Sequence, residues 1–513
     1  MQSNASQLPD DRKELIKIIK NLATQNEQLE AKIRWFEEQF HLARHKQFGA
    51  SSERNLGEQR NLFNEAEAIA EGGPFAEEIR QTIDSYQRKK PGRKPIPKDL
   101  PIERIEYRLP EEEQICPACG GPMHEMSEQC RHEVKLIPAQ VKIVQHAQLV
   151  YGCRDCEKNG IEVPIKTAQA PNPVIKKGLA SPSAVAYVMN MKFVEGVPLY
   201  RQEQHYARLG IDLSRGVLSN WMIKGSEWLE LIYGRLKQKL LEQEILHGDE
   251  TTLQVLKEPG RAAESQSYMW LYRTGSVGPP IVLFDYQPSR SGENPRKFLE
   301  GFKGYLHVDG YAGYHNIPDV TLAGCWAHFR RKFDESLKGL PSKKRSGSRA
   351  REALQRIDRL FAIERRLNNS TPEERLKERH LKSRPIVEDL HEWLEDIKSA
   401  VLPKSLFGLA VHYGLQQWPK LIRFLEDGRI EISNNRAERS IKPFVIGRKN
   451  WLFCNTPKGA RASAIIYSLV ETAKENKLNP YTYLNYLFER LPNLESKNEE
   501  TLDQLLPWNV GLK

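Results

Sequence analysis

The stretch EILHGDETTLQVL (residues 244–256) begins a series of short apolar segments that decides the fold. SYMWLYRTG (267–275), PPIVLFDYQ (279–287) and GYLHVDGYAGY (304–314) follow it along the chain. Runs of β-branched and aromatic residues that are bounded by glycine or proline are typical of strands. The sequence therefore predicts a β-sheet that begins near residue 240.

Two of these segments place an aspartate in apolar surroundings, Asp249 and Asp309. A buried carboxylate is costly unless a positive charge compensates it, and magnesium, which prefers hard oxygen ligands, can supply that charge. A pair of such ions promotes phosphoryl transfer and needs three or four carboxylates. Asp285 competes with Asp309 for this role, whereas Glu250 is less favoured because neighbours on a strand point to opposite faces. The chain has 67 acidic residues, and the sequence pattern alone does not decide which of them bind the metal.

N-terminal to the predicted sheet, residues 175–235 read as helices with a break at Gly210 and a possible N-cap at Ser214. This pattern resembles a helix-turn-helix. Its second helix would offer Arg215, Ser219 and Asn220 to a DNA groove, with Val217, Leu218 and Trp221 packing inward. Helical hairpins without any DNA contact are also common.

Two cysteine pairs, in CPACGG (116–121) and CRDC (153–156), have the spacing of metal-binding knuckles. Four thiolates complete the tetrahedron that structural zinc prefers, so we expect Cys116, Cys119, Cys153 and Cys156 to bind one zinc ion. The alternating stretch VKIVQHAQLVYG (141–152) could form a hairpin between the knuckles. Less favoured substitute ligands are Cys130, His124, His132 and His146.

The N-terminal segment repeats every seven residues, with apolar side chains and one asparagine in the a and d positions. The d positions are Leu15, Leu22, Leu29 and Phe36, and the a positions are Ile19, Asn26, Ile33 and Phe40. This pattern predicts a parallel two-stranded coiled coil, in which the asparagine fixes the register. The alternative is an amphipathic helix that packs on its own chain.

A proline-rich basic stretch, RKKPGRKPIPKDLP (88–101), separates this segment from the cysteines. Proline excludes a helix here, so Arg93 and Lys94 would lie on an extended chain that could enter a minor groove. A plain charged linker is an equally good reading.

From end to end the chain resembles the transposases of the insertion sequence 66 family. The resemblance rests on the heptads, the two cysteine motifs and LYRQEQHYARLGIDLSRGVLSNW (199–221), followed by GDET (248–251) and VDGYAGY (308–314). CWAHFRRKF (325–333) and NNRAERSIKPFVIGRKNWLF (434–453) complete it, in the same order as in the family. The last four motifs are the most specific, because they combine carboxylates with fixed aromatic and basic neighbours.

The resemblance implies that Asp249, Asp309 and Glu438 are the magnesium- or manganese-binding triad of a ribonuclease-H-like core. Asp285 then becomes a bystander. Arg439, Lys442 and Lys449 would meet DNA phosphates. Cys325 and His328 lie three residues apart, and both a role at the active site and ordinary packing remain open.

We therefore expect a multidomain α+β protein. Its parts are a coiled coil (residues 1–52), a helical and basic linker (53–110), a zinc-binding module (111–172), a helix-turn-helix region (175–235), a catalytic core (240–340 and 428–478) with a helical insertion (341–427), and a C-terminal helix and tail (479–513).

The expected partners follow from charge and resemblance. Lysine and arginine outnumber the acids by 77 to 67, which favours a polyanionic partner such as DNA. The resemblance implies terminal inverted repeats and target DNA as substrates, a homodimer or higher oligomer, and possible companion proteins of the same element. No signal core or membrane-length apolar run stands out, so we expect a cytoplasmic protein. The rivals are a DNA-binding protein without catalysis and a nuclease that never joins strands.

Overall fold

A computed structural model describes residues 12–48, 140–152, 158, 162 and 165–512. Arg93, Lys94 and the four expected zinc ligands lie outside these residues. No helix within the described ranges combines the length and the apolar character that a membrane crossing requires.

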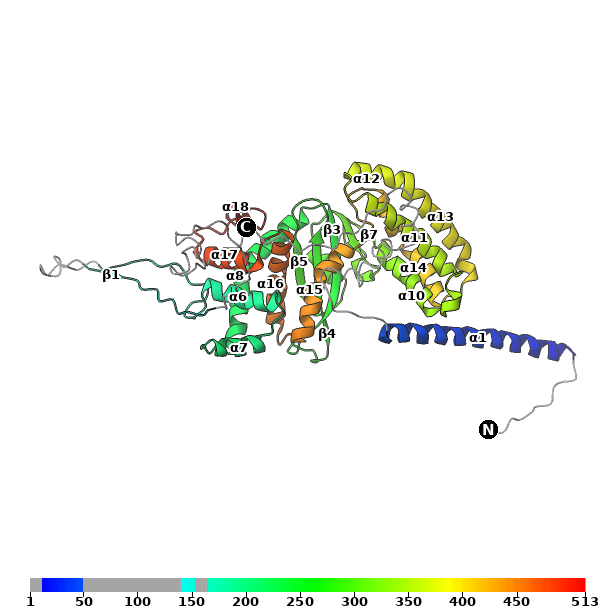
Figure 1. Cartoon of the computed structure of the whole chain (residues 1–513), viewed down its shortest axis with the longest axis horizontal. Coiled ribbons are helices and arrows are strands. Elements are labelled where there is room, and N and C mark those ends of the chain that lie inside the picture. The colour runs from blue at the N-terminus through cyan, green and yellow to red at the C-terminus, as the bar shows by residue number, and fades with distance from the viewer. Residues whose placement is uncertain (1–11, 49–139, 153–157, 159–161, 163–164, 513) are drawn as a thin grey trace, which may run out of the picture. The chain divides into compact units, whose positions relative to one another are not determined.

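A mixed five-stranded sheet lies at the centre of the fold (Figure 1). Its strands are β3 (Ile245–Gln254), β4 (Gln266–Thr274), β5 (Val282–Gln287), β6 (Gly304–Val308) and β7 (Val320–Gly324). The order across the sheet is β5-β4-β3-β6-β7. β3, β4 and β5 are antiparallel neighbours, whereas β6 and β7 run parallel to β3. The four segments predicted as strands therefore pair in one sheet, and β7 is a fifth strand that the sequence did not suggest.

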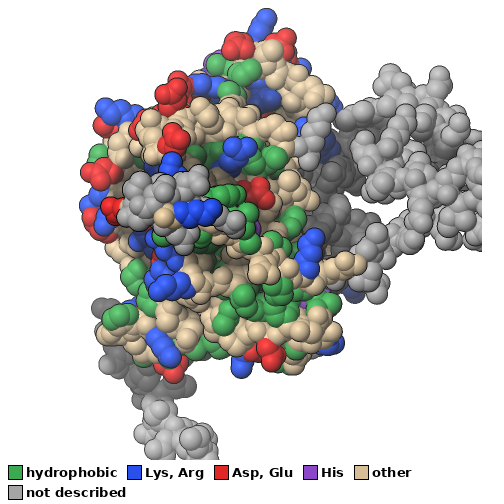
Figure 2. All heavy atoms as spheres, turned by 90° about the vertical axis from the view of Figure 1, so that its left-hand side faces the viewer, with side chains coloured by type: hydrophobic (Ala, Val, Ile, Leu, Met, Phe, Trp, Pro, Cys, Tyr) green, Lys and Arg blue, Asp and Glu red, His purple; other side chains and the backbone are tan. Residues whose placement is uncertain are grey.

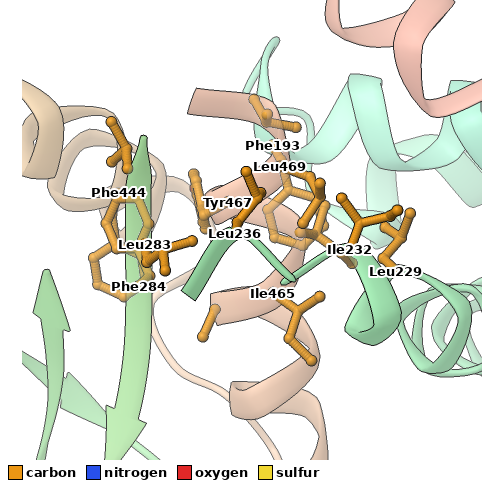
Figure 3. Packing of buried hydrophobic residues seen from close by; sticks show 14 of the residues in the cluster. Phe193, Leu229, Ile232, Leu236, Leu283, Phe284, Phe444, Ile465, Tyr467 and Leu469 are labelled. Carbon is orange, nitrogen blue, oxygen red and sulfur yellow. The ribbon is translucent and has the colours of Figure 1, made fainter. Parts of the chain in front are cut away.

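One helix that precedes the strands in the sequence and two that follow them pack against this sheet. They are α8 (Arg215–Leu241), α15 (Asn435–Trp451) and α16 (Pro457–Glu475). Figure 3 shows part of this packing, in which Phe284 of β5 contacts Phe444 of α15 and Tyr467 of α16. The hydroxyls of Ser468 and Thr472 accept hydrogen bonds from backbone N–H groups of the edge strand β5, which satisfies part of an otherwise unpaired strand edge.

The helix-turn-helix region consists of α6 (Pro182–Phe193), α7 (Leu199–Arg208) and the first turns of α8. Gly210 has a positive φ of 86° at the break, and the Ser214 hydroxyl accepts a hydrogen bond from the Val217 N–H, so the predicted break and N-cap are confirmed. The inward packing of Leu218 and Trp221 is confirmed as well. The inward packing of Val217 was wrong, because 40% of its surface is exposed.

The second helix continues far beyond the expected recognition helix. Its later residues Leu229, Ile232 and Leu236 are buried in the core of the sheet domain (Figure 3), and the Tyr233 hydroxyl donates to the Phe284 carbonyl at 3.0 Å. One helix therefore joins the helix-turn-helix to the sheet.

A second hydrophobic cluster lies in a body of helices between β7 and α15. These are α10 (Trp326–Gly339), α11 (Arg349–Arg366), α12 (Pro372–Glu378), α13 (Arg384–Ile397) and α14 (Leu406–Leu421), with a π-helical turn at Arg379–Ser383. α10 already belongs to this cluster, so the helical packing begins before residue 341. Ile245, Ile430 and Ile432 also belong to it and connect it to the sheet domain.

After α16 the chain forms α17 (Pro480–Arg490) and α18 (Glu499–Asp503). Leu502, Leu505 and Leu506 are buried in the core shared with the sheet. The buried Arg235 of α8 forms an ion pair with Asp503 of α18. This end of the chain is therefore packed against the fold.

Two segments remain. α1 (Arg12–Phe48) is a single helix, and its described a and d side chains from Ile19 to Phe40 are exposed, with the apolar ones between 54% and 65% exposed. β1 (Val150–Tyr151) pairs with β2 (Lys166–Thr167) in a short antiparallel ladder. The sequence predicts a hairpin between the cysteine pairs; within the described residues 140–152 only Val150–Tyr151 is a strand, and its partner lies after the second cysteine pair.

Candidate active site

Asp249 and Asp309 lie on or directly after neighbouring parallel strands, just beyond the point where the pairing of β3 with β6 ends. His247 of β3 is paired with His307 of β6, and each aspartate lies two residues beyond its histidine. The two imidazole rings stack at 5.0 Å and are buried. Burial lowers the pKa of His247 to about 4 and that of His307 to about 3, so both rings are neutral at pH 7. Two uncharged imidazole rings therefore lie next to the aspartates on the same strands.

Asn434 fixes the start of α15 against β3. Its Nδ2 donates to the Gly248 carbonyl at 2.8 Å, and its Oδ1 lies 2.9 Å from Nδ1 of His247, which therefore carries the donated proton. Asn434 is buried and precedes the first residue of α15. Glu438 follows it by one helical turn, so this contact, one residue from Asp249, brings the glutamate to the aspartates.

The charges of the neighbouring carboxylates raise the pKa values of Asp249 and Glu438. The pKa of Asp249 is raised well above its usual range, first by burial and then by the charges of Glu250, Glu438 and Asp309. Burial is also the main reason that the pKa of Glu438 rises to about 7; Arg331 opposes the rise and Asp309 adds to it. The structure therefore brings together the three acids that the resemblance implied.

Asp285 lies elsewhere. In the antiparallel ladders Asp285 pairs with Trp270, which pairs with Glu250, so these three residues share the face of the sheet opposite to Asp249. The Asp285 carboxylate accepts a hydrogen bond from Gln287 at 2.8 Å. Glu250 forms an ion pair with Arg290 and accepts a hydrogen bond from the Tyr314 hydroxyl at 2.7 Å. Both of these competing acids therefore have a hydrogen-bond or ion-pair partner within the protein.

Glu438 has basic neighbours from α10 but no hydrogen bond. Nδ1 of His328 is 3.4 Å from Oε1, and a guanidinium nitrogen of Arg331 is 3.6 Å from Oε2. Neither carboxylate oxygen has a hydrogen-bond partner within the described part of the chain, although only 3% of the residue is exposed. A buried carboxylate with free lone pairs beside two further carboxylates fits a hard divalent cation such as magnesium or manganese.

The helical body also contributes to this site, which the sequence did not suggest. Lys420 of α14 lies with Nζ 2.7 Å from Nε2 of His315; burial lowers its pKa, and the charge of Asp309 opposes that effect. Tyr413 packs against Gly310, where a Cβ would lie 2.8 Å from the ring. α14 therefore reaches the loop that carries Asp309.

The expected DNA-contacting residues lie in two places. Arg215 is exposed in the helix-turn-helix and forms an ion pair with Glu203 at 3.0 Å, and Asn220 is exposed nearby, with Ser219 half-buried. Arg439 and the half-buried Lys442 lie within a turn or so of Glu438, and Lys449 is exposed further along the same helix. On the face drawn in Figure 2, basic side chains are interspersed with acidic and hydrophobic ones, so charge alone does not trace a DNA path there.

Comparison with known proteins decides the family. A model described as the IS66 transposase family matches residues 177–462, which is more than half of the chain. The chain belongs to the IS66 transposase family. As a member of this family, the transposase is a DNA-transposing enzyme with DNA-binding domains.

Three further models match other parts of the transposase. The zinc-finger binding domain of transposase IS66 matches residues 113–157 and includes all four expected zinc ligands. A model described as Transposase C of IS166 homeodomain matches residues 35–105, and the IS66 C-terminal element matches 468–508. The zinc finger supports the expected structural zinc.

Several relatives are similar over most of their length. The uncharacterized protein y4hP of Sinorhizobium fredii is 31% identical over 83% of this chain and 78% of its own. The uncharacterized protein y4jD of the same organism is 32% identical over 81% of each chain.

Proposed function

We propose that Asp249, Asp309 and Glu438 are the metal ligands of a D-D-E transposase that cuts the ends of a mobile element and joins them to target DNA. The observation that carries this proposal is that the pKa values of Asp249 and Glu438 are both raised, by burial and by the charge of Asp309, although the three acids come from β3, from α15 and from the residue after β6. Perturbed acids at one site are a mark of function. The strand order, with three antiparallel strands followed by two parallel ones, supports a ribonuclease-H-like core.

Different residues would have different roles in DNA cleavage and joining. Asp249, Asp309 and Glu438 would hold two magnesium or manganese ions, which when bound activate the attacking hydroxyl and stabilise the leaving oxygen. Lys420 and Arg331 lie beside the carboxylates and would hold the negative phosphodiester in place. Hydrolysis would free a 3′-hydroxyl at each element end, and that hydroxyl would attack target DNA.

Recognition of the element would fall to the N-terminal half. The zinc finger, with Cys116, Cys119, Cys153 and Cys156 as ligands, and the helix-turn-helix residues Arg215, Ser219 and Asn220 would bind terminal inverted repeats. Arg93 and Lys94 would add minor-groove contacts, and Arg439, Lys442 and Lys449 would meet phosphates near the cut.

The exposed heptad stripe of α1 supports a dimer of the transposase, because a second copy would cover those apolar side chains. We also propose that companion proteins of the same element are partners of the transposase. We also propose the cytoplasm as its compartment, because its DNA substrate lies there.

Strand nicking of terminal-repeat DNA with magnesium or manganese tests the proposal. The wild type should nick, and Asp309→Asn should bind the same DNA without cutting it. Asp285→Asn is the matched control, because it alters a strand-end aspartate on the other face of the sheet, and it should still nick. Nicking by Asp309→Asn at the wild-type rate would overturn the proposal, and supplying a pre-cut end would separate a transposase from a nuclease that never joins strands.

A further inference from the structure

Three side chains with different donor atoms converge beside the carboxylates. A sulfur of Cys325, a ring nitrogen of His328 and an oxygen of Glu438 all lie within 4.8 Å of one another. Cys325 immediately precedes α10 and His328 lies in its first turn, so one turn of helix brings both to the same side, while Glu438 comes from α15. We call this group the Cys-His-Glu cluster.

Two of its members have buried polar atoms that form no hydrogen bond within the part of the chain that the structure describes, although Arg331 forms an ion pair with Glu438. Nδ1 of His328 and both oxygens of Glu438 are buried without a hydrogen-bond partner among the described residues. The 3.4 Å between His328 Nδ1 and Glu438 Oε1 is longer than a good hydrogen bond. Buried polar atoms without a hydrogen-bond partner are unfavourable, and one cation among them would satisfy all three atoms.

The sulfur is arranged as a metal-bound thiolate would be. Its Sγ accepts a hydrogen bond from the backbone N–H of Asn434 at 3.1 Å and lies at the N-terminus of α10. Backbone donors and a helix N-terminus both stabilise negative charge on sulfur. Burial and the charge of Glu438 nevertheless raise the pKa of the Cys325 thiol to about 12, so the metal-free thiol is protonated at pH 7. Asn434 is also the residue that positions Glu438, so one residue supports two of the three donors.

The mixture of donors selects a class of ion. Thiolate and imidazole ligands favour zinc-like ions over magnesium, and three protein ligands leave a fourth position open. We propose that Cys325, His328 and Glu438 bind Zn²⁺ or a similar thiophilic divalent ion, and that this binding draws Glu438 away from the magnesium centre and inhibits DNA cleavage. Binding would release the thiol proton to solvent, with no change of oxidation state. The inhibitory part rests on the proposed function of Glu438.

Cobalt binding tests the site without any DNA. Full-length transposase with its zinc finger filled with zinc is titrated with CoCl2, and the sulfur-to-cobalt charge-transfer band is recorded. The wild type should gain this band, and Cys325→Ser should lose it. Cys454→Ser is the matched control, since Cys454 is the other buried free cysteine in the described part of the chain, and it should keep the band. An unchanged band in Cys325→Ser would overturn the proposal.

Inhibition is measured separately. ZnCl2 is added to magnesium-dependent nicking, and each variant is compared with its own zinc-free rate. Cys325→Ser and His328→Gln should each raise the zinc concentration for half-inhibition by about tenfold or more, as loss of metal-site groups generally does. Equal zinc sensitivity in wild type and variants would overturn the inhibitory role. If no nicking occurs at all, the proposed function fails, but the cobalt band still decides whether the site exists.

Discussion

The carboxylate of Glu438 is buried, and its burial changes the pKa of the group. Burial, with the charge of Asp309, raises its pKa from the ordinary 4.5 to about 7 despite Arg331. The folded protein therefore binds a proton at Glu438 that the unfolded chain has lost between these two values. Without magnesium, the stability linked to this proton is fully present below pH 4.5 and is lost as the pH rises through 7.

Glu438→Gln should remove this dependence, because glutamine carries no charge at any pH. In urea unfolding without magnesium, the variant should be more stable than the wild type at pH 8, by on the order of 3 kcal/mol, and similar to it at pH 4. Glu300→Gln, at an exposed position, should show no such difference. A constant difference between Glu438→Gln and wild type across this range would contradict the assigned pKa.

Asn434 connects the start of α15 to β3 through hydrogen bonds. Its side chain bonds to Gly248 and His247 on the strand, and its backbone N–H bonds to Cys325 at the start of α10. Asn434 thus fixes the start of the helix that carries Glu438, while Arg273 of β4 holds the same helix through the Arg436 carbonyl and the Ser440 hydroxyl.

Asn434→Ala should destabilise the fold by about 1–3 kcal/mol, because it leaves the Gly248 carbonyl and the His247 ring without partners. It should also weaken magnesium binding, measured by isothermal calorimetry, since Glu438 is no longer held in place. Asn450→Ala, at an exposed position near the other end of α15, serves as the control. Unchanged magnesium affinity in Asn434→Ala would show that the glutamate is positioned by other contacts.

Much of the sheet could be predicted from local pattern, and much of the site could not. The four apolar segments, the break at Gly210 and the cap at Ser214 follow from alternation and turn chemistry, which are local properties. The exposure of Val217 depends on how α8 packs, which its sequence does not specify. The separation of Asp285 from Asp249 follows from strand register, and the approach of Lys420 to the Asp309 loop joins residues more than a hundred positions apart. Only tertiary structure supplies such contacts.

For the whole molecule, the heptads of α1 predict a dimer. Replacing Leu22 and Leu29 with glutamate places charges in the apolar seam, so the mass measured by light scattering should fall from that of a dimer to that of a monomer. Asn21→Glu adds a charge at an outward heptad position and should leave the dimer intact. A dimer that survives both leucine changes would assign dimerisation to another surface.

Removal of the structural zinc should separate recognition from catalysis. Cys116→Ser should lower the zinc content by one ion per chain and weaken binding to terminal repeats by at least about tenfold, which is what one lost bidentate base contact costs. Cys130→Ser should change neither, because Cys130 is outside the expected ligand set. Loss of zinc from Cys130→Ser would revise the ligands.

Anomalous X-ray scattering from manganese can show whether three acids that are distant in the sequence share divalent ions. Crystals of the transposase soaked in MnCl2 should show manganese bound between Asp249, Asp309 and Glu438, and this signal should vanish in Asp309→Asn crystals. Manganese found only beside Glu250 or Asp285, with none at the three acids, would contradict the account.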